Sequence, residues 1–414
     1  MSTVLQAGGS LFTQSAAPPT AAYVHIPFCR RRCFYCDFPI AVAGDQARGE
    51  TSPTMATYVE TLCREIRATP VLGSAAAPLT TVFFGGGTPS LLAVDQVGQI
   101  LHCLDQRFGI ATGAEISMEM DPGTFGRSQI QRLKTLGISR VSLGVQAFQD
   151  ELLTACGRTH RCADIDRAVA DLQGAAIPTW SLDLISGLPH QTLEIWQDSL
   201  ESAIALHPQH ISVYDLTVEP GTVFHRRYRA GDDPLPPDDA TTTMYRRTQA
   251  TLTAAGYDHY EISNYARPGH QCRHNRVYWE NRPYYGFGMG ATSYTQYQRF
   301  GRPRTTHTYQ QWVQDYEAAG GQLDCDVTPL QEQWLDRLMV GLRLAEGVVL
   351  SDLPLDLGPE AFVDLQRCLA PHQEQGWVQW STDPHPHLRL TDPEGFLFSN
   401  QVLVTLFADW CSES

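Results

Sequence analysis

Six short apolar runs alternate with amphipathic stretches in the first half of the chain, and this alternation limits the fold more than any other feature. The runs occupy residues 23–28, 81–84, 115–120, 140–145, 179–185 and 210–216. Between the first two, residues 55, 58, 59, 62, 63 and 66 are apolar at the spacing of one helix face. Strands that alternate with helices form parallel βαβ units. The pattern predicts the α/β class and favours a partial TIM-like (β/α)6 barrel over a doubly wound sheet.

The length of 414 residues predicts more than one domain. Residues 1–21 are small and polar and are interpreted as a disordered leader. Residues 22–300 carry the strand and helix alternation and form the predicted barrel domain. From about residue 301 to 414 the pattern changes to helices and a hairpin, typical of a smaller C-terminal α+β domain.

The charge balance excludes some partners. With 30 Lys and Arg against 45 Asp and Glu, the formal net charge is −15, which repels nucleic acid and anionic lipid. The sequence contains no apolar run of about 18 residues and no secretory signal pattern, so we expect a cytoplasmic protein without stable membrane insertion. Its eleven cysteines are scattered rather than arranged as a disulfide framework.

Three cysteines form a cluster in the loop after the first predicted strand. Cys29, Cys33 and Cys36 follow the spacing C-x3-C-x2-C. Three thiolates within eight residues suit one face of an iron–sulfur cubane and leave one iron without a protein ligand. A zinc site completed by His25, or three unrelated core cysteines, are the alternatives.

The cysteine spacing, with the aromatic Tyr35 before the last cysteine, resembles the radical-SAM superfamily. The resemblance implies a 4Fe-4S cluster whose open iron is chelated by S-adenosyl-L-methionine (SAM). Reduction of that complex yields a 5′-deoxyadenosyl radical in the superfamily. The glycine run Gly85–Gly87 after the second strand is similar to the loop that contacts the SAM amino group.

Longer sequence motifs, called words below, indicate a narrower family within the superfamily. YVHIPFC, FFGGGTPS, EMDP, LGVQAF, GRTH and DLISGLP resemble the oxygen-independent coproporphyrinogen III oxidase-like family from about residue 23 into the C-terminal domain. At the strand ends, the polar residues of these words form a ring suited to a ribose, a carboxylate and a sulfonium. The SAM contacts implied by the resemblance are Tyr23, Gly86, Gly87, Thr88, Glu119, Gln146, Arg158, Asp183 and Thr217.

Two features separate the branches of this family. The decarboxylating oxidases have a fourth cysteine where this chain has Phe38. Residues 274–279, HNRVYW, match the H-N-x-x-Y-W word of the heme chaperone HemW branch. Imidazole is a common axial ligand of heme iron, and flat aromatic side chains suit a porphyrin. The implied heme contacts are His274, Asn275, Tyr278 and Trp279.

The leading hypothesis is a heme chaperone that carries a 4Fe-4S cluster and SAM, lacks coproporphyrinogen oxidase activity, and passes heme to an acceptor hemoprotein, such as a membrane-bound respiratory one. The rival hypothesis is oxygen-independent oxidative decarboxylation of coproporphyrinogen III. A third is radical-SAM chemistry on another substrate.

Overall fold

A nine-stranded sheet forms the centre of the computed structural model, which describes residues 17–73, 77–322, 325–350, 359–381 and 386–410. Its strand order is β11-β1-β4-β5-β6-β7-β8-β10-β9. The six strands from β1 to β8 are parallel neighbours in chain order, so every crossover leads onward in the same direction. A doubly wound sheet reverses its strand order midway. The predicted partial barrel is confirmed, and the doubly wound alternative is wrong.

These six strands overlap the six predicted apolar runs. They are β1 (Ala21–Ile26), β4 (Leu79–Gly86), β5 (Ile110–Met120), β6 (Arg140–Gln146), β7 (Thr179–Ser186) and β8 (His210–Asp215). Short strands extend the sheet beyond both ends of this series: β11 (Tyr285–Phe287) lies beside β1, and β10 (Asn264–Ala266) and β9 (Asp258–Glu261) follow β8.

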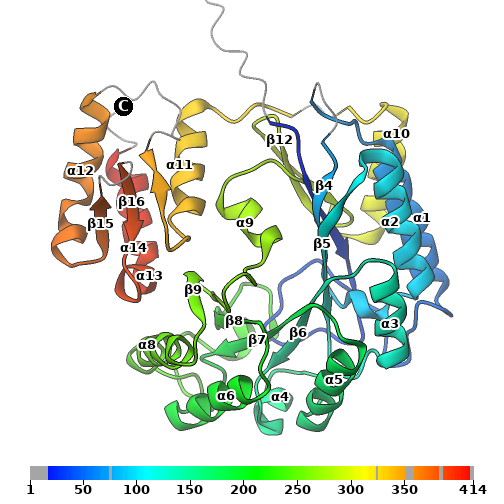
Figure 1. The fold of residues 1–414 in the computed structure, drawn as a ribbon, viewed down its shortest axis with the longest axis horizontal. Coiled ribbons are helices and arrows are strands. Elements are labelled where there is room, and N and C mark those ends of the chain that lie inside the picture. Colours follow the sequence, from blue (N-terminus) through cyan, green and yellow to red (C-terminus); the bar gives the residue numbers. More distant parts are fainter. Residues whose placement is uncertain (1–16, 74–76, 323–324, 351–358, 382–385, 411–414) are drawn as a thin grey trace, which may run out of the picture.

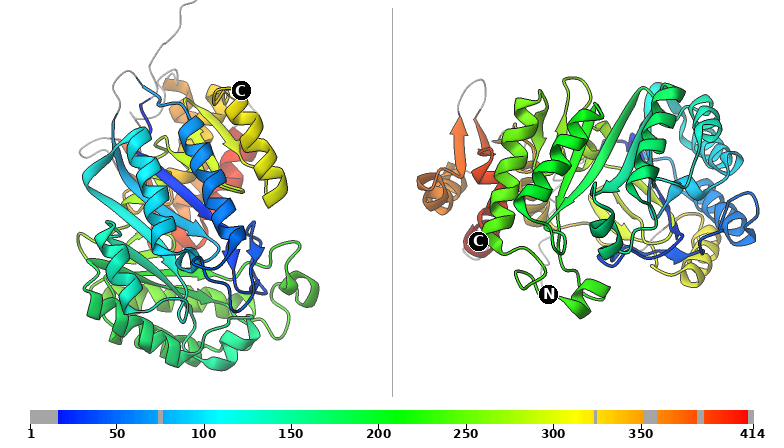
Figure 2. Two further views of the ribbon diagram at one scale, coloured as in Figure 1. Left: turned by 90° about the vertical axis from the view of Figure 1, so that its right-hand side faces the viewer. Right: turned by 90° about the horizontal axis from the view of Figure 1, so that it is seen from below.

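Helices cover the outer face of the curved sheet (Figures 1 and 2). The predicted helix over residues 55–66 is α1 (Pro53–Ala68), which begins where Ser52 accepts a hydrogen bond from the Met55 amide and proline occupies the first turn. The following outer helices are α2 (Val94–Phe108), α3 (Arg127–Thr135), α4 (Asp150–Ala155), α5 (Cys162–Ala175), α6 (Leu193–Ala205) and α8 (Asp238–Ala254).

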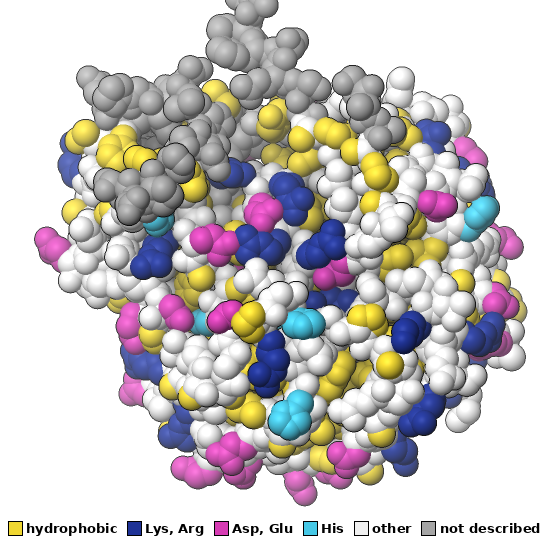
Figure 3. All heavy atoms as spheres, viewed as in Figure 1, with side chains coloured by type: hydrophobic (Ala, Val, Ile, Leu, Met, Phe, Trp, Pro, Cys, Tyr) yellow, Lys and Arg dark blue, Asp and Glu magenta, His cyan; other side chains and the backbone are white. Residues whose placement is uncertain are grey.

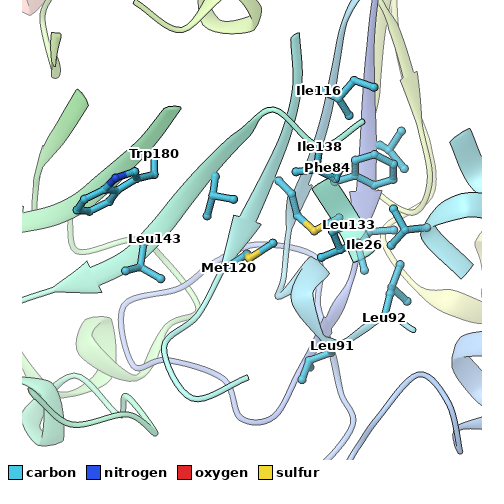
Figure 4. Close-up of a cluster of buried hydrophobic side chains, with 14 of the residues drawn as sticks. Ile26, Phe84, Leu91, Leu92, Ile116, Met120, Leu133, Ile138, Leu143 and Trp180 are labelled. Atoms are coloured by element: carbon cyan, nitrogen blue, oxygen red, sulfur yellow. The ribbon is translucent and has the colours of Figure 1, made fainter. Parts of the chain in front are cut away.

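Alternation along β5 separates an apolar outer face from a polar inner face. In β5, Ile116, Met118 and Met120 are buried in the main hydrophobic core, while Ser117 and Glu119 point the other way and line an internal cavity. Figure 4 shows the outer residues of several strands packed together with helix side chains such as Leu133. The apolar contacts that hold the barrel therefore lie outside the sheet, and its polar lumen is free for ligands.

A short helix, α9 (Arg273–Trp279), carries the HNRVYW word and lies near the centre of the view in Figure 1. It packs on β4, and its first residues lie near the amino ends of the barrel strands, since His274 contacts Thr81. The word thus lies opposite the end of the barrel that carries the cysteine loop.

The last part of the chain has its own hydrophobic core. The predicted hairpin is present as β15 (Val378–Ser381) paired antiparallel with β16 (His387–Leu390). Around it lie α11 (Leu330–Gly341), β14 (Val348–Val349), α12 (Pro359–Glu374), α13 (Glu394–Leu397) and α14 (Ser399–Thr405).

The domain limits at 21 and 300 stay predictions. Residues 1–16 of the predicted leader lie outside the described residues, and β1 begins at Ala21. On the other side of residue 300, α10 (Thr306–Ala318) packs on α1, while the hairpin of β12 (Thr292–Thr295) and β13 (Gln298–Gly301) spans the limit.

Acidic and basic side chains are interspersed over the face seen in Figure 3, so the surplus of acidic residues is not gathered there. Within the described ranges, no helix combines the length and apolar character that crossing a membrane requires.

Candidate functional site

A cavity of about 400 Å³ opens at the carboxyl ends of the barrel strands, where active sites of this architecture lie. We call it the cofactor cavity. Its wall includes all three clustered cysteines and eight of the nine predicted SAM contacts: Gly86, Gly87, Thr88, Glu119, Gln146, Arg158, Asp183 and Thr217. Residues that are up to 188 positions apart in sequence are thus brought to one site, as the barrel prediction requires.

The cysteine loop is fixed at several points. Its start and end pair as β2 (Phe28–Cys29) and β3 (Ala41–Val42). In the middle, the Phe34 amide donates to the Cys156 carbonyl at 2.9 Å. The Arg32 guanidinium donates to the carbonyls of Cys36 and Phe38 at 3.2 and 3.1 Å. The loop therefore presents its thiols from a defined backbone, which favours prearranged metal ligation.

The surroundings of the thiols suit a cluster of iron and sulfide. Thr88 Oγ1 lies 3.7 Å from Cys29 Sγ, and Arg158 Nη1 donates to Cys33 Sγ at 3.4 Å. Burial raises the pKa of Cys29 to about 12, so its thiolate needs a metal cation for stabilisation. Among the described residues, no three His, Cys, Asp or Glu side chains gather closely enough to hold a single metal ion.

The zinc alternative needed His25 as a fourth ligand, and the structure uses that side chain elsewhere. His25 Nδ1 lies 3.0 Å from the Tyr23 hydroxyl, and His25 Nε2 lies 3.0 Å from the Pro39 carbonyl oxygen. Burial lowers the pKa of His25 to about 4, so the imidazole is neutral. His25 therefore ties β1 to the end of the cysteine loop, and ligation of a metal by His25 would require one of these two contacts to break.

The glycine loop approaches this histidine closely. Gly86 has a φ of 109°, and a Cβ atom added there would lie 2.3 Å from the His25 ring. A Cβ atom at Gly87 would lie 2.7 Å from the Phe28 carbonyl oxygen. Larger residues would push the glycine loop away from the cysteine loop, so the two loops pack directly because both positions are glycine.

Two buried carboxyl groups face the cofactor cavity. Burial raises the pKa of Glu119 to about 8, although the Gly86 amide, which donates to it at 2.9 Å, opposes the rise. Burial likewise raises the pKa of Asp183 to about 6, against hydrogen bonds led by Ser142 Oγ. Both groups are poised to accept positive charge or hydroxyl donors from a ligand.

A partly buried ion pair joins two walls of the cavity. Arg158 pairs with Asp121 and also donates to the Gly144 carbonyl at 2.9 Å. Asp121 in turn accepts from Thr88 Oγ1 at 2.9 Å. Gln146, at the end of β6, has a φ of 69°, a backbone state that non-glycine residues adopt mainly where function or packing requires it. Arg158 thus connects the cluster loop, the glycine loop and the end of β6.

We expect SAM binding to depend on pH through Glu119. Below its pKa of about 8 the carboxyl is neutral, and above it the anion attracts the permanent positive charge of the sulfonium. The affinity for SAM relative to S-adenosylhomocysteine, which lacks that charge but shares the amine, should rise about tenfold as pH increases through this value. Anaerobic calorimetry with both ligands measures the ratio. Glu119→Gln should flatten it; a ratio that still climbs in this variant would contradict the role of Glu119.

A second cavity, of about 230 Å³, lies deeper in the lumen, and we call it the lumen cavity. It shares part of its wall with the cofactor cavity, namely Phe38, Glu119, Ser142, Asp183 and Tyr214. Tyr23, the ninth predicted SAM contact, lines the lumen cavity rather than the cofactor cavity. Three predicted heme contacts also line the lumen cavity: His274, Asn275 and Tyr278.

The predicted heme ligand is held inside the fold. His274 Nδ1 lies 2.9 Å from Thr81 Oγ1, and His274 Nε2 lies 2.8 Å from the Tyr278 hydroxyl. Burial lowers the pKa of His274 to about 3, which keeps the imidazole neutral. Ligation of heme iron by His274 therefore requires one of these two hydrogen bonds to break.

The remaining residues of the word have different surroundings. The ring of Tyr278 packs edge-on against His274, with centroids 5.1 Å apart. Trp279, the fourth predicted heme contact, lines neither cavity; its ring lies under the Arg343 guanidinium at 4.4 Å. The structure thus brings three of the four heme residues to one cavity and leaves Trp279 apart.

Sequence reasoning missed several residues of these walls. Asp121 lies within the EMDP word beside Glu119, and Ser142, Ser181 and Ser212 line the lumen from three successive strands. A signal was present, because residues two apart on a strand share one face, and each serine is two residues from another lumen-facing position.

Known proteins resemble this chain over most of its length. Residues 23–203 match the Radical SAM superfamily. A protein named heme chaperone HemW from Synechocystis sp. is 50% identical over 404 residues, which cover 94% of this chain and 97% of that protein. The heme chaperone HemW of Escherichia coli is 39% identical over 66% of this chain and 70% of its own length. A zebrafish (Danio rerio) protein named radical S-adenosyl methionine domain-containing protein 1, mitochondrial, is 31% identical over 84% of this chain and 78% of that protein.

Among solved structures, the coproporphyrinogen III oxidase HemN from Escherichia coli, described as a radical SAM enzyme, aligns with a TM-score of 0.78. The alignment covers 94% of this chain and 90% of that chain at 22% sequence identity. At this identity the likeness establishes the fold alone.

Proposed function

We propose that this chain, which belongs to the heme chaperone HemW family within the radical SAM superfamily, binds heme and passes it to an acceptor hemoprotein. The observation that carries the proposal is the 50% identity to a protein named heme chaperone over 97% of that protein's length. The lumen cavity adds support, because it is lined by three residues of the HNRVYW word.

The proposed cofactors are one 4Fe-4S cluster and SAM. Cys29, Cys33 and Cys36 would hold three irons of the cluster, with Arg158 donating to the sulfur of Cys33 and Thr88 lying beside that of Cys29. The bound cluster supplies single electrons to SAM. The protein's own part is to orient SAM by the glycine loop, Glu119, Gln146, Arg158, Asp183 and Thr217, and to exclude water from the buried end of the cavity.

The proposed heme contacts are His274, Asn275, Tyr278 and Trp279. For His274 to ligate iron, the imidazole must exchange its hydrogen bond with Tyr278 for the metal, while the bond with Thr81 keeps the ring oriented. The acceptor is proposed to be a hemoprotein, and the location to be the cytoplasm.

The alternative hypothesis, an oxygen-independent coproporphyrinogen III oxidase, can be tested with its own substrate. Phe38 occupies the position at which the resemblance places a fourth cysteine in the decarboxylating oxidases, and its ring carries no sulfur ligand. We expect reconstituted protein to leave coproporphyrinogen III unchanged under anaerobic conditions with SAM and a reductant. Formation of protoporphyrinogen IX would establish the oxidase function instead.

Hemin titration tests the chaperone function and the ligand together. We expect hemin to produce a Soret band with the wild-type protein, and His274→Ala to weaken heme affinity about tenfold or more, since the iron loses its axial ligand. Absorbance titration of the full chain measures both.

Tyr278→Phe is the matched control, because it removes the hydroxyl that competes for His274 Nε2 but keeps the imidazole and the ring. It should retain the Soret band. If His274→Ala also retains the wild-type band, the imidazole is not the heme ligand.

A further inference from the structure

Two aromatic rings at the junction of the cavities are unusually exposed. Phe38 is 52% exposed and Tyr214 is 45% exposed, and each lines both the cofactor cavity and the lumen cavity. A single exposed apolar side chain on a surface is common. Two aromatic rings exposed on the shared wall of two cavities instead indicate a surface meant to contact a ligand.

The backbone holds both rings at this junction. The Phe38 carbonyl accepts from Arg32, and the next carbonyl, of Pro39, contacts the buried His25 ring. Tyr214 follows His210 and Ser212 at two-residue steps on β8, and all three line the lumen cavity. The rings are therefore exposed on fixed backbone positions.

An aromatic wall continues inward from Phe38. The rings of Tyr23 and Phe83 are stacked with centroids 6.2 Å apart and planes inclined by 23°. Phe83 then stacks on His274 at 5.2 Å and 25°. Phe38 lines the same cavity as these three residues. Three neighbouring aromatic rings give this wall an apolar surface, which suits an aromatic ligand.

The opposite wall differs in chemistry. It is made of strand residues with hydroxyl or charged groups, namely Ser117, Glu119, Arg140, Ser142, Ser181, Asp183 and Ser212. A ligand between these walls has one flat apolar face and polar groups elsewhere. Heme is a flat aromatic macrocycle with carboxylate side chains: its ring suits the aromatic wall, and Arg140 is the residue of the polar wall that can pair with a carboxylate. A purely apolar ligand would leave the polar wall unpaired.

We propose that Phe38 and Tyr214 contact the porphyrin of bound heme at the entrance to the lumen cavity, with the rings from Tyr23 to His274 forming the face behind it. This inference rests on the proposed function. It adds two heme-contact residues outside the HNRVYW word and places heme beside the cofactor cavity.

The test compares ring-removing with ring-retaining variants of the full chain by anaerobic hemin titration. Phe38→Leu and Tyr214→Leu keep apolar bulk but lose the flat ring, and each should raise the hemin dissociation constant about five- to tenfold. Phe38→Trp and Tyr214→Phe keep a flat ring and should bind hemin as the wild type does. Phe407→Ala is the matched control, since Phe407 is 42% exposed but lines neither cavity.

The outcomes separate the inference from the function. If the wild type binds hemin and the leucine variants bind it equally well, the inference is wrong and the chaperone function stands. If ring-retaining variants lose as much affinity as ring-removing ones, ring stacking is not the cause and the inference also falls. A wild type that binds no hemin overturns both. Melting temperatures equal to the wild type exclude misfolding as the source of lost affinity.

Discussion

Cys33→Ala is expected to abolish cluster assembly, so that the variant stays colourless after anaerobic reconstitution. Three thiolates already leave one iron without a protein ligand, and a second missing ligand removes half of the usual four. The loop cannot readily offer a substitute, because the Phe34 amide is fixed on Cys156 and Arg32 holds the carbonyls of Cys36 and Phe38. Iron and acid-labile sulfide per chain, together with the visible absorption, measure the result.

Cys325→Ala is the control for the loss of a thiol. Cys325 is partly exposed and lines neither cavity, so this variant should assemble the cluster as the wild type does. A Cys33→Ala variant with wild-type iron and sulfide would contradict the assignment of the three cysteines. Loss of colour in both variants would point to general instability rather than to ligation.

The barrel could be predicted because its strands carry their own signal. In the run EISMEM, Ile116, Met118 and Met120 alternate with Ser117 and Glu119, and the structure buries the first set against helices while the second lines the lumen. Such a pattern needs no knowledge of the partner strand. Chain order then sufficed for the topology, because short right-handed crossovers place successive strands side by side.

The edge strands could not be predicted in the same way. β11 has three residues, Tyr285–Phe287, and all three are buried, so it shows no alternation. The sequence pattern predicts no strand there. Its place beside β1 depends on backbone hydrogen bonds to residues more than 250 positions away, a long-range pairing that no local pattern encodes.

The candidate site likewise contains residues that could be predicted from the sequence and residues that could not. The three cysteines and most of the residues predicted to contact SAM lie in short words at strand ends, and the barrel gathers them at one cavity. The environment of His274 was not accessible, because its partner Thr81 lies 193 residues away. The exposure of the Phe38 and Tyr214 rings could not be predicted from the sequence either, because exposure depends on the open side of the barrel rather than on residue type.

Arg302→Ala is expected to lower the unfolding free energy by about 3 to 5 kcal/mol, because it leaves a buried carboxylate without its cation. Arg302 Nε donates to Glu65 at 2.8 Å, and the two side chains are 1% and 0% exposed. Glu65 also accepts from the Gly288 amide at 2.9 Å and from the Tyr309 hydroxyl. The pair therefore joins α1 and α10 to the turn that follows β11.

The loss of stability in Arg302→Ala should extend to the cysteine loop through a short series of contacts. The turn held by Glu65 continues to Met289, whose amide donates to the Tyr58 hydroxyl at 3.1 Å, and Tyr58 donates to the His25 carbonyl at 2.7 Å. His25 in turn contacts Pro39 at the end of the cysteine loop. We therefore expect Arg302→Ala to lose its cluster faster in air than the wild type, in addition to melting earlier.

Arg64→Ala is the matched control, because Arg64 pairs with Glu317 between the same two helices, α1 and α10, but with side chains 39% and 48% exposed. An exposed pair contributes at most about 1 kcal/mol, so the control should melt close to the wild type and keep its cluster. Thermal unfolding followed by circular dichroism compares the two variants. Equal melting temperatures for Arg302→Ala and Arg64→Ala would mean that burial of the Glu65 pair does not hold this corner of the barrel, and that the cysteine loop is supported from elsewhere.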